Sequence, residues 1–280
     1  MNVIIIGSGL MGSGIAIESI RAGFNTLLYD INNEALTKAE SYIHKQLDKA
    51  QSIGKITKEH KANALKLLQF SQKFEDLKGD FILEAIVEKL PVKQELFAKL
   101  EAQNTENCIF ATNTSSIPIT QIGRGLKHPE RLVGVHFFNP AHIMKLVEII
   151  SGAATNTAVA EKAFEWAKKL GKTAVYAKDA PGFIVNRVAR HFYVESLKAL
   201  EEQVGEFEQM DKLMRSTGFK MGPFELMDLI GVETNYSVTQ SMFEQFQYDS
   251  KFRPSRIQKQ KVDAGFHGRK TKQGFYTYDP

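Results

Sequence analysis

The sequence predicts an α/β fold: a doubly wound parallel sheet with an inserted helical hairpin, followed by an all-α C-terminal domain. Two observations predict it. Short apolar runs alternate with helix-like segments through the first part of the chain, which is typical of a parallel sheet wrapped by helices. Strand-like runs nearly vanish from Phe183 onward. We therefore expect two domains, residues 1–182 and residues 183–280.

The first strand is expected at residues 1–6, and it leads directly into a GxGxxG motif and a helix-forming run at 13–21. Gly7 permits the tight turn, Gly9 allows the backbone to approach a pyrophosphate, and Gly12 allows close packing of helix on strand. The start of the helix offers free N–H groups and a positive dipole end to phosphates. The motif residues expected at the cofactor are Gly7, Gly9, Leu10, Met11 and Gly12. This combination indicates a Rossmann-type dinucleotide-binding domain.

Asp30 closes the second apolar run, residues 25–29. Its carboxylate is placed to accept hydrogen bonds from the two hydroxyls of an adenosine ribose, and it would repel a 2′-phosphate. No arginine follows in Ile31, Asn32 and Asn33. The sequence therefore favours NAD over NADP.

Two charged amphipathic segments, 33–51 and 57–68, read as a helical hairpin inserted between the second and third strands and hinged near Gly54. The third strand is expected at 80–85, and a helix that has Pro91 in its first turn at 91–102. Further strands are expected at 108–112, 132–138, 145–150 and 173–177, with a helix at 156–170. The C-terminal helices are expected at 184–202, 207–216, 223–229, 233–245 and 254–264.

Composition excludes several classes of protein. Hydrophobic residues make up 43% and charged residues 24%, which is typical of a globular protein, and the net charge of +4 is modest. Basic residues are scattered rather than clustered with aromatic ones, so we expect no nucleic-acid partner. No run is long enough to cross a membrane. The single cysteine, Cys108, is typical of a reducing compartment, and we expect a cytoplasmic protein.

The polar run 112–116 directly follows a predicted strand, at the edge of a parallel sheet where ligands bind. Its serine and threonine residues are also good helix N-caps, and both roles are compatible. A second candidate pair is His136 and Glu148. Glu148 is the one acid in an otherwise apolar strand and needs a partner. Antiparallel pairing of the two strands would bring it to His136, forming the dyad that a general base requires.

The chain resembles the 3-hydroxyacyl-CoA dehydrogenase family over essentially its whole length. The resemblance rests on seven motifs in the family's order: Gly7–Gly14, Glu84-Ala85-Ile86-Val87-Glu88, Asn113-Thr114-Ser115-Ser116, His136-Phe137-Phe138-Asn139-Pro140, Pro181-Gly182-Phe183-Ile184-Val185-Asn186-Arg187, Met221-Gly222-Pro223-Phe224-Glu225-Leu226, and Gly268-Arg269-Lys270 with Gly274-Phe275-Tyr276.

The resemblance implies roles for individual residues. His136 corresponds to the catalytic base and Glu148 to its partner. Ser115 and Asn186 correspond to catalytic polar residues that hold the substrate hydroxyl and acyl carbonyl, and Asn139 to a further substrate-binding residue. The cofactor-binding set extends to Asp30, Glu88, Lys93, Asn113 and Lys270. No metal site is expected, and the basic residues of the hairpin, such as Lys45 and Lys49, could meet CoA phosphates.

The resemblance implies NAD-dependent oxidation of (S)-3-hydroxyacyl-CoA to 3-oxoacyl-CoA, as in fatty acid metabolism and β-oxidation, by a homodimer. The substrate could be 3-hydroxyadipyl-CoA, as in phenylacetate breakdown, or 3-hydroxybutyryl-CoA. Arg187, Arg190 and Arg253 are candidate partners for a second carboxylate. A non-catalytic NAD-binding or structural protein on the same fold is the alternative. The 3-hydroxyisobutyrate and 6-phosphogluconate type of dehydrogenase uses a lysine motif that this sequence lacks.

Overall fold

The computed structural model describes residues 1–279 and divides into two compact units, Met1–Ala180 and Pro181–Pro280. The division falls two residues before Gly182, at a short connection between the last strand and the first helix of the second unit. The α/β unit followed by a helical unit confirms the predicted fold class. Each unit is described separately below.

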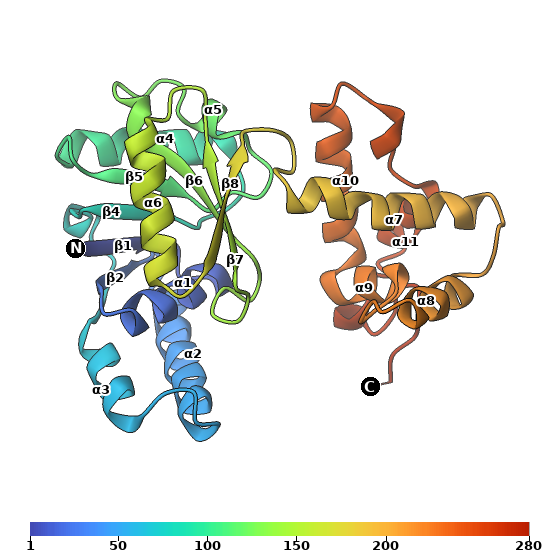
Figure 1. The fold of residues 1–280 in the computed structure, drawn as a ribbon, viewed down its shortest axis with the longest axis horizontal. Coiled ribbons are helices and arrows are strands. Elements are labelled where there is room, and N and C mark those ends of the chain that lie inside the picture. The colour runs from blue at the N-terminus through green and yellow to red at the C-terminus, as the bar shows by residue number, and fades with distance from the viewer. Residues whose placement is uncertain (280) are drawn as a thin grey trace. The chain divides into compact units, whose positions relative to one another are not determined.

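An eight-stranded sheet forms the centre of the first unit, in the order β3-β2-β1-β4-β5-β6-β7-β8 (Figure 1). Every neighbouring pair is parallel except β6 and β7, which run antiparallel. The strands are β1 (Asn2–Ile6), β2 (Asn25–Tyr29), β3 (Leu68–Ser71), β4 (Phe81–Glu84), β5 (Ile109–Thr112), β6 (Leu132–Phe137), β7 (Leu146–Ser151) and β8 (Thr173–Lys178).

Helices cover both faces of this sheet. They are α1 (Leu10–Arg21), α2 (Asn33–Ser52), α3 (Lys58–Lys66), α4 (Leu90–Gln103), α5 (Ile119–Ile122) and α6 (Thr157–Lys169). Alternate side chains of a strand point to opposite faces, so each face needs its own cover. The aromatic rings of Phe97 in α4 and Phe110 in β5 lie 5.9 Å apart on one face. On the other face α1 and α6 meet the sheet.

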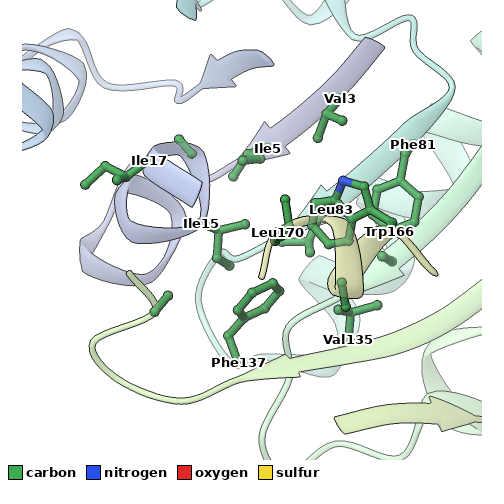
Figure 2. Close-up of a cluster of buried hydrophobic side chains, with 14 of the residues drawn as sticks. Val3, Ile5, Ile15, Ile17, Phe81, Leu83, Val135, Phe137, Trp166 and Leu170 are labelled. Atoms are coloured by element: carbon green, nitrogen blue, oxygen red, sulfur yellow. The ribbon is translucent and has the colours of Figure 1, made fainter. Parts of the chain in front are cut away.

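A hydrophobic core lies between the sheet and the helices α1 and α6 (Figure 2). Val3 and Ile5 of β1 and Leu83 of β4 belong to one buried cluster with side chains of both helices, and Val135 and Phe137 of β6 belong to it as well. Trp166 of α6 stacks on Phe81 at 4.4 Å between ring centroids. The core therefore fixes β6, and with it the end of the strand that carries His136, against the helix that follows the glycine motif.

One part of the hairpin prediction is wrong. The second helix ends at Lys66 rather than at residue 68, and the chain continues as the edge strand β3, paired with β2. This strand has only four residues and is half-buried, so its sequence carries little periodicity. The predicted third strand, at 80–85, is thus the fourth strand along the chain.

The second unit contains α7 (Val185–Glu201), α8 (Phe207–Ser216), α9 (Pro223–Ile230), α10 (Val232–Gln245) and α11 (Arg256–Asp263). Two buried carboxylates join segments of this unit. Asp211 of α8 accepts hydrogen bonds from the backbone of α9 and from the Tyr276 hydroxyl, and Asp228 of α9 accepts from the backbone of Phe275 and Tyr276. The C-terminal segment is thereby held on the helices. Within residues 1–279, no helix is long and apolar enough to cross a membrane.

Candidate active site

The glycine motif makes the turn between β1 and α1. Gly7 has a φ of +101°, and a side-chain carbon there would meet the Ala85 carbonyl oxygen at 2.6 Å. A glycine is required because of both the left-handed backbone and the close approach. At Gly9, by contrast, a side-chain carbon would meet nothing within 4 Å. Gly9 therefore borders open space in front of the first turn of α1, where a pyrophosphate could approach the backbone.

Asp30 lies at the end of β2 beside this turn. Its Oδ2 accepts hydrogen bonds from the Ser8 backbone N–H and the Ser8 hydroxyl, both at 2.8 Å, and its Oδ1 accepts from the Asn32 N–H at 3.0 Å. These neutral donors fix the carboxylate without neutralising it. It forms one wall of a cavity of about 810 Å³ that Gly7 and Gly9 also line. The apolar walls, among them Ile86, fit an adenosine group that presents its ribose to Asp30.

His136 and Glu148 lie opposite each other in the antiparallel β6–β7 pair, as the sequence predicts. The His136 Nδ1 atom is 2.7 Å from Glu148 Oε2. Both side chains are buried, with 6% of the His136 side chain and 0% of the Glu148 side chain exposed. A carboxylate can only accept, so Nδ1 carries the proton and Nε2 is the basic nitrogen. The arrangement can hold an imidazolium that forms when Nε2 takes a proton.

The polar run after β5 is held as a tight turn by Glu88. One oxygen of this carboxylate, Oε1, accepts hydrogen bonds from the Thr114 hydroxyl at 2.5 Å, the Ser115 N–H at 3.0 Å and the Ser116 N–H at 3.2 Å. Ser115 is thus fixed at the carboxyl end of the sheet. Burial favours the neutral form of Glu88, but the Lys93 ammonium and the Thr114 and Ser115 donors outweigh it and hold the pKa of Glu88 below its ordinary value.

Lys93 lies behind this turn, inside the protein. Only 1% of its side chain is exposed, and its ammonium is 2.6 Å from Glu84 Oε1 and 3.1 Å from Glu88 Oε2. Glu84 is fully buried and also accepts from the Thr112 hydroxyl at 2.7 Å. Glu84, Lys93 and Glu88 therefore form a chain of charges from the sheet to the turn that holds Ser115.

Two asparagines of the expected site lie at the ends of β5 and β6. The Asn113 side-chain oxygen accepts a hydrogen bond from the Phe137 N–H at 2.8 Å, which joins the two strands next to His136. Asn139 is exposed, two residues after β6, and precedes a cis peptide bond to Pro140. The first unit thus brings His136, Glu148, Ser115, Asn113 and Asn139 to one edge of the sheet.

The remaining predicted residues belong to the second unit. Asn186 lies in the first turn of α7, and Lys270 forms an ion pair with Glu233. The three arginines have different surroundings. Arg190 is buried and donates to the Asn235 carbonyl and the Thr239 hydroxyl, Arg253 is 3.7 Å from Glu201, and the exposed Arg187 lies over the Phe246 ring.

Sequence reasoning assigned no role to Glu84 or to Lys172. Each is a charged residue in or beside an apolar strand. This position in the sequence indicates a buried ion pair, because a buried charge requires a partner. The same argument found Glu148. For Glu84 the partner lies nine residues later in the following helix, and for Lys172 it is Glu18 of α1 at 2.9 Å.

Two family models match the chain. Residues 2–180 match the 3-hydroxyacyl-CoA dehydrogenase NAD binding domain, and residues 182–278 match the C-terminal domain of the same family. The structure is similar to that of (S)-3-hydroxybutyryl-CoA dehydrogenase from Ralstonia eutropha, with a TM-score of 0.96 and 34% identity, over 100% of this chain and 99% of that one.

Curated relatives carry two substrate names. A 3-hydroxyadipyl-CoA dehydrogenase of Escherichia coli K12 is 45% identical over 99% of this chain, which spans 58% of that relative's length. A 3-hydroxybutyryl-CoA dehydrogenase of Bradyrhizobium diazoefficiens is 40% identical over 98% of this chain, and the match covers 94% of that relative's length. The matches cover both units, and the chain belongs to the 3-hydroxyacyl-CoA dehydrogenase family.

Proposed function

We propose that this chain catalyses the NAD-dependent oxidation of (S)-3-hydroxyacyl-CoA to 3-oxoacyl-CoA and the reverse reduction. The observation that carries the proposal is the buried His136–Glu148 pair at the same sheet edge as the glycine turn and Ser115. A protein that only bound NAD would have no use for such a base. Family membership favours the catalytic function for the same reason.

His136 acts as the general base. Its Nε2 takes the proton of the C3 hydroxyl while the C3 hydrogen departs as hydride, so that the C3–oxygen bond becomes a carbonyl. NAD, when bound, supplies the hydride acceptor. Glu148 keeps the Nδ1 proton in place and stabilises the imidazolium. Proton transfer to a positioned base contributes about 10²–10⁴-fold to such a rate.

Polar side chains orient the substrate. Ser115, fixed by Glu88, binds the reacting hydroxyl, and Asn186 binds the acyl carbonyl. Asn139 binds the substrate beyond the reacting carbons. Positioning of this kind lowers the entropic part of the barrier.

The residues proposed to bind the cofactor lie in and around the glycine turn, together with Lys270. Gly7, Gly9 and Gly12 make the turn for the pyrophosphate, with Leu10 and Met11 in its first helical turn, and Asp30 binds the ribose hydroxyls. Glu88 and Asn113 shape the nicotinamide side of the site, Lys93 supports Glu88 from behind, and Lys270 is a further cofactor-binding residue.

We further propose a short acyl chain, with 3-hydroxyadipyl-CoA preferred over 3-hydroxybutyryl-CoA. The 45% identity to a 3-hydroxyadipyl-CoA dehydrogenase supports this order. The test is a panel of short, medium and dicarboxylic 3-oxoacyl-CoA thioesters, assayed by loss of NADH absorbance with wild type and His136→Gln. Turnover by wild type alone supports the function, and the ranking of kcat/KM values identifies the acyl group. No turnover of any thioester by wild type would contradict the proposal.

We also infer that the enzyme works as a cytoplasmic homodimer that associates through the helical unit. That unit exposes large apolar side chains, including Val188, Val204, Leu213 and Phe219 at 51–74%. Such residues are typical of a surface that is covered in an assembly. The single Cys108 is a buried thiol, which suits a reducing compartment. Light scattering of the purified protein tests the assembly, and a monomeric mass at micromolar concentration would contradict it.

A further inference from the structure

The loop between β6 and β7, residues 138–145, exposes two large apolar side chains at its tip. Ile143 is 60% exposed and Met144 is 42% exposed. Single exposed apolar residues are common on protein surfaces, but two adjacent ones on a constrained loop next to a reacting group are a candidate ligand contact. We define Ile143 and Met144 as the apolar tip.

The exposure of the apolar tip is imposed by the backbone beneath it. The N–H groups of Ile143 and Met144 both donate to the Pro140 carbonyl at 2.9 Å, which closes a tight turn. The buried Lys172 ammonium then binds two further carbonyl oxygens of the loop, that of Ala141 at 2.6 Å and that of Met144 at 3.1 Å. Because these bonds fix the turn, the two side chains point outward in a set arrangement.

Lys172 also ties the loop to the nucleotide-binding part of the unit. Its third partner is Glu18 of α1, at 2.9 Å. On the same helix, a side-chain carbon at Gly14 would lie 3.1 Å from the Ala141 Cβ, so the loop packs directly against α1. Figure 2 shows Phe137 at the end of β6, from which the chain turns toward α1.

The other side of the loop contacts α2, the helix that carries Lys45 and Lys49. The His142 ring packs edge-on against Tyr42 of α2, with 5.8 Å between ring centroids. Burial lowers the pKa of His142, the Glu18 carboxylate opposes this shift, and nearby cations, among them Lys172 and Lys49, add to it. Lys49 follows Tyr42 by two turns of α2 and therefore lies on the same face of that helix. The loop thus joins the end of β6, which carries His136, to the helix that carries these lysines.

We propose that the apolar tip, Ile143 and Met144, contacts the pantetheine arm of the acyl-CoA, and that Lys172 is the positioning residue that presents it. This proposal rests on the proposed function. The pantetheine arm joins the reacting thioester to the phosphates and carries methyl and methylene groups, which match an apolar contact. The tip thus serves the middle of the substrate, between the dyad at one end and the basic face of α2 at the other.

A series of truncated substrates tests the proposal. The substrates are acetoacetyl-CoA, acetoacetyl-pantetheine and acetoacetyl-N-acetylcysteamine, the last of which lacks most of the arm. The double variant Ile143→Ser/Met144→Ser should raise KM about fivefold for the first two, as expected for the loss of about 1 kcal/mol of binding, and leave the third unchanged. Ile53→Ser, an exposed apolar residue at the far end of α2, is the matched control and should change none of them.

Lys172→Met tests the positioning role. It should reproduce the same pattern across the three thioesters while the Kd for NADH stays at the wild-type value, whereas a purely structural role would lower activity equally with all three. Unchanged KM values in the double variant would overturn the proposal. An equal loss with all three substrates, or a change in oligomeric mass, would also overturn it, since the tip would then support the fold or contact a second copy. Turnover of the N-acetylcysteamine substrate by wild type tests the proposed function separately.

Discussion

The two units of the molecule bury charge in different ways. In the first unit the buried charges form ion pairs beside the candidate site: His136 with Glu148, Lys93 with Glu84, and Lys172 with Glu18. In the helical unit the buried carboxylates Asp211 and Asp228 instead accept hydrogen bonds from backbone N–H groups and tyrosine hydroxyls.

This difference matches two different tasks. A carboxylate held by neutral donors joins segments of the fold, as Asp228 joins α9 to the C-terminal segment. An ion pair can hold a charged side chain in one place and support a change of charge nearby. We therefore expect the pairs of the first unit to affect substrate binding and catalysis, and the carboxylates of the second unit to affect stability.

The largest effect is expected at the dyad. His136→Gln should lower turnover of acetoacetyl-CoA by at least ~10²-fold, because the proton-transfer group is removed. Glu148→Gln should also be severe, because the imidazolium loses its counter-charge. NADH binding, measured by fluorescence titration, should remain near wild type in both variants. A His136→Gln enzyme that retains most of its turnover would remove this residue from the mechanism.

Asp30 of the first unit differs from these ion pairs, because it accepts hydrogen bonds from the neutral donors of Ser8 and Asn32. Its negative charge is therefore available to discriminate between cofactors. Asp30→Ala should weaken NAD binding about tenfold or more, as for loss of a hydrogen bond to a charged group, and should improve the relative use of NADP. The quantity to compare is the ratio of kcat/KM for the two cofactors. A wild-type enzyme that already prefers NADP would contradict the role of Asp30.

Asp228→Asn tests the other half of the comparison. Asp228 accepts from two backbone N–H groups at 2.9 Å and from the Tyr278 hydroxyl at 3.0 Å, and an amide cannot satisfy all three. The free energy of unfolding should fall by about 2 kcal/mol, measured by urea denaturation. Turnover per folded molecule should change little. A large loss of turnover with normal stability would mean that this carboxylate acts on the site.

The double variant Glu84→Gln/Lys93→Met removes the charges behind Glu88 together and avoids leaving Glu84 as an unpaired buried carboxylate. In wild type the pKa of Glu88 lies below its ordinary value. The turn that the ionised Glu88 holds therefore persists to low pH and is lost only as pH falls through this lowered pKa. Loss of the Lys93 ammonium removes a positive charge that lowers the pKa of Glu88, so this pKa should rise in the variant.

We therefore expect the acid limb of the kcat/KM profile to lie at higher pH in the variant than in wild type, because protonated Glu88 is a weaker acceptor for the N–H groups of Ser115 and Ser116. The control is Lys162→Met, which removes an exposed lysine of α6. Parallel acid limbs in the variant and wild type would separate Glu88 from the positioning of Ser115.

The features of the first unit that follow from a local sequence pattern could be predicted from the sequence alone. The glycine motif, Asp30 and the order of strands and helices could be predicted because each follows from periodicity or turn chemistry. The His136–Glu148 pair could be predicted because one acid in an apolar strand requires a partner in the neighbouring strand. The edge strand β3 could not, since four half-buried residues carry almost no pattern.

The charge chain through Glu84 and Lys93 and the triple contact of Lys172 could not be predicted from sequence either. Their partners include backbone carbonyls and residues far along the chain, which only the folded arrangement brings together. The resemblance to the family predicts Glu88 and Lys93 as cofactor-binding residues. It did not indicate that one of them holds the Ser115 turn and the other lies behind it.

The smallest effect is expected where charges are solvated rather than buried. Lys45 and Lys49 are exposed on α2, and surface charges are worth roughly 0–1 kcal/mol each. Replacing both with Ala should raise KM for acyl-CoA several-fold and reduce the dependence of this KM on salt, with little effect on KM for NAD.

Acetoacetyl-pantetheine, which lacks the nucleotide phosphates, should be used equally well by wild type and variant. The control replaces Lys162 and Lys169, two exposed lysines of α6, a helix to which no role in CoA binding is assigned. An equal loss with both substrates would mean that the lysines support the fold, and the CoA phosphates would have to bind elsewhere. A loss confined to the CoA thioester would complete the contrast, with buried pairs positioning the reacting groups and exposed charges attracting the distant end of the substrate.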